Sequence, residues 1–462
     1  MYKALLTALA AAATLAACSH TPPETPDGGI CKLKRVWIEQ PLPGEEPLES
    51  VLEDPSGPML FLSGGSQNGA FGAGFLHGWN ESKVDASGKP VGLPKFSVVT
   101  GISTGALQAT GAFTGRTDIT VDGYTIDDED DLLDTFVKGS SGDGDGIGAG
   151  DALTAVRKGA LSDLIPLRGR LDRILTDEVL NEVARRGREE GARLLVGATD
   201  FDLGQAVAFD MTDLAGRYAN APSEQEKKTL KGCYIEALIA SSVVPGAAKP
   251  VFIDNRKYID GGVRFAVFDD RVGQVLRDAR QASAEAVGAQ DIPYAPETSV
   301  YIIFNSDGEP KAKCAKVDDA NCNPIEGLDG ARKDWDFLSL VLGTVGQLVD
   351  QVQRLSIERA RQRGDDLLAE THFARINASV IGESGTAFTI PDFAGSKTCE
   401  AWREIDDQTD APLEFHKRFM RCLIEYGRER GKAENWDYDN SGAVKRAREA
   451  AEEAKRAREG GA

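Results

Sequence analysis

The stretch Val98-Val99-Thr100-Gly101-Ile102-Ser103-Thr104-Gly105-Ala106-Leu107 decides the fold, because it joins a β-branched run to helix formers through a serine. Glycines two positions before and two positions after this serine give the Gly-x-Ser-x-Gly pattern of a nucleophile elbow. In such an elbow a strand turns sharply into a helix, and the glycines let the backbone pass closely while one hydroxyl stays exposed. The helix N-terminus would stabilise an anion beside Ser103. A strand-to-helix turn of this composition also occurs for packing alone, so both interpretations stay open at this point.

A second glycine-rich segment follows an apolar run upstream. Met59-Leu60-Phe61-Leu62 has the composition of a buried strand, and the loop Ser63-Gly64-Gly65-Ser66-Gln67-Asn68-Gly69-Ala70 precedes a helical pattern that reaches Trp79. A strand, a glycine-rich loop and a helix start form a cradle of N–H groups for an anion. The loop lacks the Lys-Ser/Thr ending of a phosphate loop and the spacing of a dinucleotide loop. Together with the elbow at Ser103 it predicts an oxyanion hole for acyl transfer.

Length and charge limit the function classes. The chain has 462 residues, which corresponds to about two to four domains by size, or to one large α/β core with an appendage. It carries 53 Lys and Arg against 73 Asp and Glu, a net charge of −20. This balance argues against nucleic acid as a partner and against electrostatic attraction to anionic lipid. It also favours solubility.

The N-terminus has the pattern of an export signal. An apolar run over residues 4–17 follows Lys3, and it is too short for a spanning helix but suits a secretory h-region. Its end, Leu15-Ala16-Ala17-Cys18, resembles the lipobox of bacterial lipoproteins. That resemblance implies a signal peptide over 1–17, lipid attachment at Cys18 and, since Ser19 is not aspartate, an outer-membrane location facing the periplasm. The alternatives are a buried helix or simple secretion.

Six further cysteines could form disulfides in an exported protein. Cys314 with Cys322, and Cys399 with Cys422, are plausible pairs, which would leave Cys31 with Cys233 by subtraction. Six cysteines allow fifteen pairings, so the sequence does not choose among them. The cysteine spacing matches no zinc site, and neither a metal nor a cofactor is expected.

The order of elements along the chain predicts an α/β core. Residues 18–55 are rich in Pro, Glu and Gly and are expected to form a flexible tether, so that the fold begins near Met59. The acidic segment 114–151 is expected to be a solvated loop, since a calcium loop starting at Asp143 would have Thr154 at its twelfth position. Helices are predicted within 152–188 and 235–242, strands at 193–199, 205–209 and 300–304, and a hairpin over 251–259.

The chain after the expected last strand near residue 304 has helical patterns. One long helix is predicted over 334–363, shorter ones over 395–435, and a charged, solvated helix over 440–458. Asp260 lies at the end of an apolar strand and before Gly261-Gly262, where its carboxylate could reach a neighbouring loop. An aspartate that only caps a turn is the structural alternative.

Three separated motifs, in order, make the chain similar to the patatin-like phospholipase family. They are the loop Gly64 to Gly69, the elbow Gly101 to Gly105 and Asp260-Gly261-Gly262. The resemblance extends over residues 59–305. It implies a three-layer α/β fold with a central, mostly parallel sheet between helices. The expected organisation is a hydrolase domain over 56–365 and a mainly helical extension with a charged tail over 366–462.

The resemblance also implies a Ser-Asp dyad, with Ser103 as nucleophile and Asp260 as base. The oxyanion donors would come from Gly64, Gly65, Ser66 and Thr104. The family usually has a third glycine where Ser66 stands and a basic residue where Asn68 stands, so esterase chemistry is better supported than a phospholipid head group. A triad with His372 or His416 is the alternative to the dyad.

The predicted function is therefore lipid acyl hydrolysis through an acyl-enzyme, on phospholipid, lysophospholipid or another acyl ester. The expected partner is membrane lipid, as the substrate and as the layer that holds the lipid anchor at Cys18. No nucleic acid is expected, and no protein partner is identified. A general esterase or peptidase, and a non-catalytic envelope protein that binds lipid or a partner, are the alternatives.

Overall fold

The computed structural model describes residues 29–39, 41–51, 57–135, 160–268, 299–308, 337–367, 369–410 and 412–459. The expected signal peptide over 1–17, the expected lipidation at Cys18 and the pair of Cys314 and Cys322 lie outside these residues.

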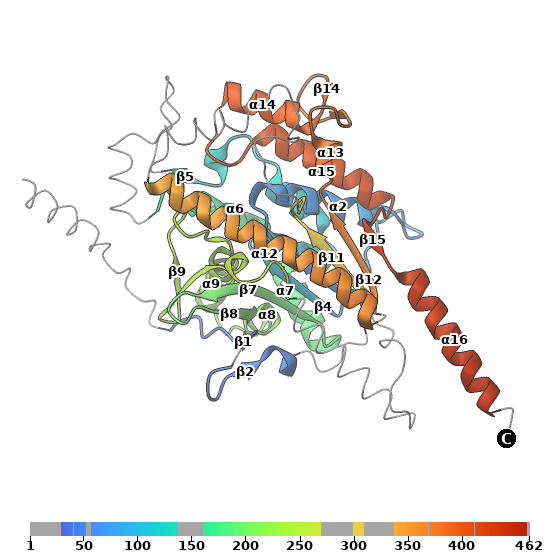
Figure 1. Ribbon diagram of the computed structural model, residues 1–462. Coiled ribbons are helices and arrows are strands. Elements are labelled where there is room, and N and C mark those ends of the chain that lie inside the picture. Colours follow the sequence, from blue (N-terminus) through green and yellow to red (C-terminus); the bar gives the residue numbers. More distant parts are fainter. Residues whose placement is uncertain are drawn as a thin grey trace, which may run out of the picture.

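A central sheet, eleven-stranded within the described residues, organises the molecule (Figure 1). Its spatial order is β15 (Tyr438–Asp439), β12 (Glu370–Arg375), β11 (Ser299–Phe304), β3 (Met59–Leu62), β4 (Val98–Ile102), β7 (Arg193–Asp200), β8 (Gln205–Asp210), β1 (Arg35–Trp37) and β2 (Glu46–Pro47). The five strands from β12 to β7 in this order are parallel to one another. Three pairs are antiparallel: β8 with β7, β1 with β8, and β15 with β12. A hairpin of β9 (Val251–Ile253) and β10 (Arg256–Asp260) also pairs with β7. The predicted mostly parallel α/β fold is confirmed.

Both faces of the sheet are covered, which explains why its central strands are apolar throughout. Successive residues of β3 alternate between the two cores: Leu60 and Leu62 lie in one, and Met59 and Phe61 in the other. The first core includes side chains from α2 (Gly69–Glu81), α3 (Thr104–Thr114), α6 (Ile165–Ile174), α7 (Asp177–Glu189), α8 (Met211–Ala219), α9 (Glu224–Ser242), α14 (Cys399–Thr409) and α15 (Lys417–Lys432). The second core includes α12 (Phe337–Leu367), the orange helix that crosses the sheet in Figure 1.

The remaining elements are short or peripheral. They are η1 (Leu48–Val51), η2 (Ser66–Asn68), α4 (Thr117–Tyr124), η3 (Glu129–Asp131), β5 (Asp134–Thr135), β6 (Ser162–Asp163), η4 (Gly261–Val263), α13 (Ala378–Ile381), β13 (Phe388–Thr389), β14 (Ser396–Lys397) and α16 (Ser441–Glu459). Helix α16 leaves the body of the molecule in Figure 1. None of the helices described is long and apolar enough to cross a membrane.

The prediction of a flexible tether over 18–55 is wrong for residues 29–51. Strand β1 pairs antiparallel with β8, and its Val36 and Trp37 are buried. The segment is rich in Pro, Glu and Gly, as loops are, but it also contains the short apolar run Val36 to Ile38. Burial of these three side chains stabilises the strand in spite of the loop-like composition around it. The fold therefore begins well before Met59.

The acidic segment after Thr114 was expected to be a loop, but its first part is α4. One side of this helix is buried through Thr117, Thr120 and Tyr124, which recur at helical spacing. Because these side chains carry hydroxyl groups, a search for apolar residues at helical spacing does not detect the buried face. The helix forms because of its tertiary packing rather than because of its local sequence pattern. Residues 136–159 of the segment lie outside the described part.

The sheet continues past the strand that was expected to be its last. Strand β12 pairs parallel with β11, and α15 packs closely on α2. A Cβ at Gly74 of α2 would lie 2.0 Å from the Ile424 carbonyl oxygen, so glycine is required for this approach. Residues after 366 thus complete the sheet and the first core. Helices α14, α15 and α16 lie where helices were expected, and the boundary at 365 stays a prediction.

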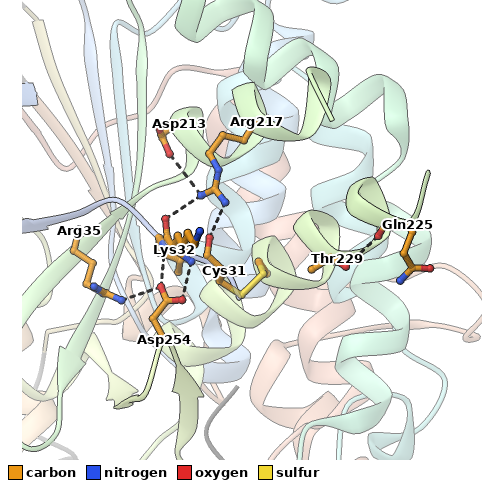
Figure 2. The surroundings of a disulfide bond; sticks show 10 residues. Cys31, Lys32, Arg35, Asp213, Arg217, Gln225, Thr229 and Asp254 are labelled. Carbon is orange, nitrogen blue, oxygen red and sulfur yellow. Dashed lines mark hydrogen bonds and ion pairs between the residues drawn. A yellow bond between two sulfur atoms is a disulfide. The ribbon is translucent and has the colours of Figure 1, made fainter. Parts of the chain in front are cut away.

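Two disulfides link distant parts of the described chain. Cys399 and Cys422 join α14 to α15, and Cys31 joins the N-terminal segment to Cys233 of α9. Figure 2 shows how the segment around Cys31 is held: Arg217 donates to the Cys31 carbonyl, and Asp254 accepts from the Lys32 backbone N–H. Both pairings were among those considered from the sequence, and both are confirmed.

Candidate active site

Ser103 lies at the turn between β4 and α3, with φ 54° and ψ −126°. A positive φ is rare for a residue other than glycine and is typical of a strained elbow. The flanking glycines are needed for close approach, because a Cβ at Gly105 would lie 2.3 Å from the Leu62 carbonyl oxygen. The end of α9 holds the turn: Ser103 N–H donates to Ser241 Oγ at 2.8 Å, and Ser242 Oγ donates to the Ser103 carbonyl at 3.2 Å.

Strand register brings Asp260 to the elbow. Ile102, the last residue of β4, pairs with Gly197 of β7, and Asp260 of β10 pairs with the next residue, Ala198. Strand β8 pairs with the opposite side of β7, so β4 and β10 pair with the same side of β7, one after the other. The Asp260 carboxylate and Ser103 line the same cavity, and the hydroxyl of Ser103 is near enough to the carboxylate to lower its pKa.

The Asp260 carboxylate is buried, with 4 % of the residue exposed. Burial raises its pKa from 3.8 to about 6, and the Glu414 charge also raises it, whereas hydrogen bonds from Ser103 and Gly262 lower it. The Gly262 backbone N–H donates to Oδ1 at 2.6 Å. This carboxylate is therefore ionised at neutral pH, yet a better proton acceptor than an ordinary aspartate.

The glycine-rich loop lies beside the serine. A Cβ at Gly64 would lie 3.1 Å from the Ser103 Cβ, and a Cβ at Gly65 would lie 1.9 Å from the Asn305 carbonyl oxygen. Gly65 has φ 150° and Ser66 has φ 51°. Among the described residues, the N–H groups of Gly64 and Gly65 have no hydrogen-bond acceptor, and Thr104 N–H begins α3 without an intrahelical one. Gly64 and Gly65 line one cavity together with Ser103, and Thr104 lines another together with Ser103. An oxyanion hole needs backbone donors near the nucleophile.

Two cavities meet at Ser103. The larger, about 330 Å³, is lined mainly by apolar side chains, among them Leu107, Leu132, Leu161, Leu171, Phe415 and Met420. The smaller, about 190 Å³, lies toward α12 and is lined by Asp260, Asn68, Val349 and Arg354. An ester at Ser103 could place an apolar chain in the first cavity and its other half in the second.

The histidines of the described chain do not complete a triad. His372 of β12 stacks on Tyr301 of β11, and its Nε2 lies 3.2 Å from Glu370 Oε1. His416 Nε2 lies 2.8 Å from Asp407 Oδ1, and His416 Nδ1 lies 3.1 Å from Gln67 Oε1, both within hydrogen-bond distance. Neither histidine hydrogen bonds with Ser103. No three His, Cys, Asp or Glu side chains within the described ranges are grouped so as to hold a metal ion.

Several residues at the site were not singled out from the sequence. Ser241 and Ser242 hold the elbow, and the Ser66 hydroxyl donates to Glu414, which comes from the C-terminal part of the chain. The Glu129 carboxylate, expected to be in a solvated loop, accepts the backbone N–H groups of Glu414 and Phe415 at 2.6 and 2.8 Å.

Comparison with known proteins agrees with this geometry. Residues 60–268 match the family model described as patatin-like phospholipase, and this range contains Ser103, Asp260 and the glycine-rich loop. No curated protein matches the chain. Residues 60–268 therefore form a patatin-like phospholipase domain, and the protein is in general terms a lipid acyl hydrolase.

Proposed function

We propose that the protein is a serine hydrolase that cleaves carboxylic ester bonds of phospholipids or related acyl lipids with a Ser103–Asp260 dyad. The observation that carries this proposal is the placement of Ser103 beside the buried carboxylate of Asp260 by strand register, at the point where an apolar cavity meets a second cavity. The family match supports lipid acyl hydrolysis in general. The dyad, the phospholipase A or lysophospholipase type and the mechanism are our inference.

In the first half of the reaction, Ser103 Oγ attacks the ester carbonyl carbon and its proton passes to Asp260. The new oxyanion accepts hydrogen bonds from the backbone N–H groups of Gly64, Gly65, Ser66 and Thr104. When the intermediate collapses, the bond to the alcohol oxygen breaks and the alcohol takes the proton from Asp260. The acyl group stays on Ser103 as an ester.

In the second half, water attacks the acyl-enzyme and gives its proton to Asp260. The second oxyanion collapses, the carboxylic acid leaves, and Ser103 Oγ takes the proton back. The raised pKa of Asp260, about 6, suits a group that must both accept and donate a proton near neutral pH.

The larger cavity supports a lipid acyl chain as the substrate group bound on one side of Ser103. Its leucine-rich lining would remove the chain from water, and each buried methylene contributes about 0.8 kcal/mol. A general esterase would use the same dyad without this preference. A non-catalytic lipid-binding protein would use the cavity without the dyad.

The test is hydrolysis of a phospholipid and a short-chain ester by the protein, beside Ser103→Ala and Asp260→Asn. We expect both variants to lose at least about 100-fold in kcat. His372→Gln, on β12 and outside both cavities, should keep wild-type turnover. Circular dichroism checks that each variant is folded. If Ser103→Ala keeps full turnover, or the wild type cleaves neither ester, a lipid- or partner-binding role replaces the enzyme.

We also propose that the protein is anchored by lipid at Cys18 to the outer membrane and faces the periplasm. The two disulfides support an oxidising compartment, and the lipobox-like sequence supports the anchor. Labelled palmitate fed to an expressing bacterium should enter the wild type but not Cys18→Ala, which should leave the membrane fraction. An unlabelled wild type would contradict the anchor.

A further inference from the structure

The junction of the two cavities has an acidic residue that does not belong to the proposed dyad. Four residues line both cavities: Ser66, Ser103, Val244 and Glu414. Under the proposed function the ester is held at this junction, because its acyl chain and its alcohol part extend to opposite sides of Ser103. Glu414 therefore lies where the alcohol part of the substrate begins.

The position of Glu414 is fixed by contacts on both sides. The Ser66 hydroxyl donates to its carboxylate. The Glu129 carboxylate accepts the backbone N–H groups of Leu413 at 2.8 Å, Glu414 at 2.6 Å and Phe415 at 2.8 Å. Gln67, which follows Ser66, accepts the backbone N–H of His416 at 3.1 Å. The segment that carries Glu414 is thus attached to both η3 and the glycine-rich loop, and its carboxylate is held in place.

The described residues that line the smaller cavity carry more negative than positive charge. Among the described residues that line it, four carry carboxylates, Asp260, Asp307, Asp350 and Glu414, and one is cationic, Arg354. Arg354 Nη2 donates to Gln351 Oε1 at 2.7 Å. Asn68 also lines the cavity and adds no charge. An alcohol part with a phosphate anion would meet repulsion here, whereas hydroxyl or ammonium groups could donate to these oxygens.

We propose that Glu414 is a specificity-determining residue that makes the enzyme prefer esters whose alcohol part is neutral or cationic over esters whose alcohol part carries net negative charge. This inference rests on the proposed function and names the alcohol half of its substrate. Ser66 has a supporting role, because its hydroxyl holds the Glu414 carboxylate at the junction.

The test compares two substrates with the same lauroyl chain: 1-lauroylglycerol, which is neutral, and its 3-phosphate, which is an anion. We expect the wild type to have the higher kcat/KM on the neutral ester. Glu414→Gln keeps the shape and the acceptor for Ser66 but removes the charge, and should lower the ratio of the two kcat/KM values about fivefold to tenfold. The ratio does not depend on how much of each variant is folded.

The matched control is Glu404→Gln on α14, which makes the same change in net charge at an exposed side chain that lines neither cavity. It should leave the ratio of the two kcat/KM values unchanged. If it lowered this ratio as much as Glu414→Gln does, the cause would be general repulsion between an acidic protein and an anionic micelle, not recognition at Glu414. Ser66→Ala should lower the ratio less than Glu414→Gln does. Added salt should lower the wild-type ratio.

The possible failures are distinguishable. If the wild type hydrolyses both esters equally, prefers the phosphate, or keeps its ratio in Glu414→Gln, the role of Glu414 is overturned while the proposed function stands. If the folded wild type hydrolyses neither ester, nor any phospholipid or short-chain ester, the proposed function fails, and this inference with it.

Discussion

The two cavities that meet at Ser103 differ in how they can recognise a substrate. The larger is lined by leucines and other apolar side chains, so it selects by hydrophobic burial and shape. The smaller has Asp260, Asp350 and Glu414 among its lining residues, so it selects by charge and hydrogen bonding. Under the proposed function, one half of an ester would be distinguished by its length and the other by its polarity. The four predictions below concern residues of these two cavities.

The largest expected effect concerns Asp260, which faces the acidic cavity. Because it must be ionised to accept the Ser103 proton and its pKa is about 6, kcat/KM should fall about tenfold for each pH unit below 6. At pH 4 the loss should reach about 100-fold. The measurement is a pH profile on the neutral, soluble short-chain ester, with circular dichroism to confirm the fold. A profile that stays flat down to pH 4 would contradict Asp260 as the base.

The second prediction is that Asp260→Asn stabilises the fold at pH 8. Folding raises the pKa of Asp260 from 3.8 to about 6, so its contribution to stability is full below about pH 4 and is lost as pH rises through 6. A neutral amide avoids this loss, and the free energy of unfolding in urea should rise by about 1 to 3 kcal/mol at pH 8.

The gain should disappear near pH 4, where aspartate in the folded protein is already protonated. Asp366→Asn, at an exposed position of α12, is the control and should change stability at neither pH. Equal effects of Asp260→Asn at both pH values would show that the buried charge is not the cause.

The third prediction concerns the apolar cavity alone. Leu107 lies one helical turn after Ser103 and lines this cavity. Leu107→Trp should fill the space and lower kcat/KM about tenfold for a long-chain ester, with little change for an acetyl ester. Leu107→Met, which conserves volume, is the control. An equal loss on both esters would mean that the cavity does not hold the acyl chain.

The smallest effect is expected at Asp350, on the acidic side only. It lines the smaller cavity from α12 but not the larger one. Asp350→Asn should lower the preference for the neutral over the anionic lauroyl ester about twofold, since a half-buried charge is partly screened by solvent. The acyl-chain preference should stay the same. A change in chain-length preference would contradict the separation of the two cavities.

Much of the site was predictable because its requirements are local. The strand turns into the helix with a positive φ at Ser103, and the close backbone contacts around this turn leave no room for a Cβ at residues 101 and 105. Glycines at these two positions therefore made the elbow visible in the sequence. The hairpin over 251–260 was predictable for the same reason, since Asp254 and Asn255 both have positive φ in its two-residue turn. The misses were of the opposite kind: β1 and α4 are buried although their composition resembles that of loops.

The sequence by itself determined the parallel α/β core, the elbow at Ser103 and the glycine-rich loop, because each depends on residues that are neighbours in the chain. Only the tertiary structure decided which distant groups meet there. The register of β4 and β10 on β7 places Asp260 beside Ser103, and the contacts of Glu129 place Glu414 at the junction of the cavities. Those contacts join segments far apart in sequence, and no local pattern of residues encodes them.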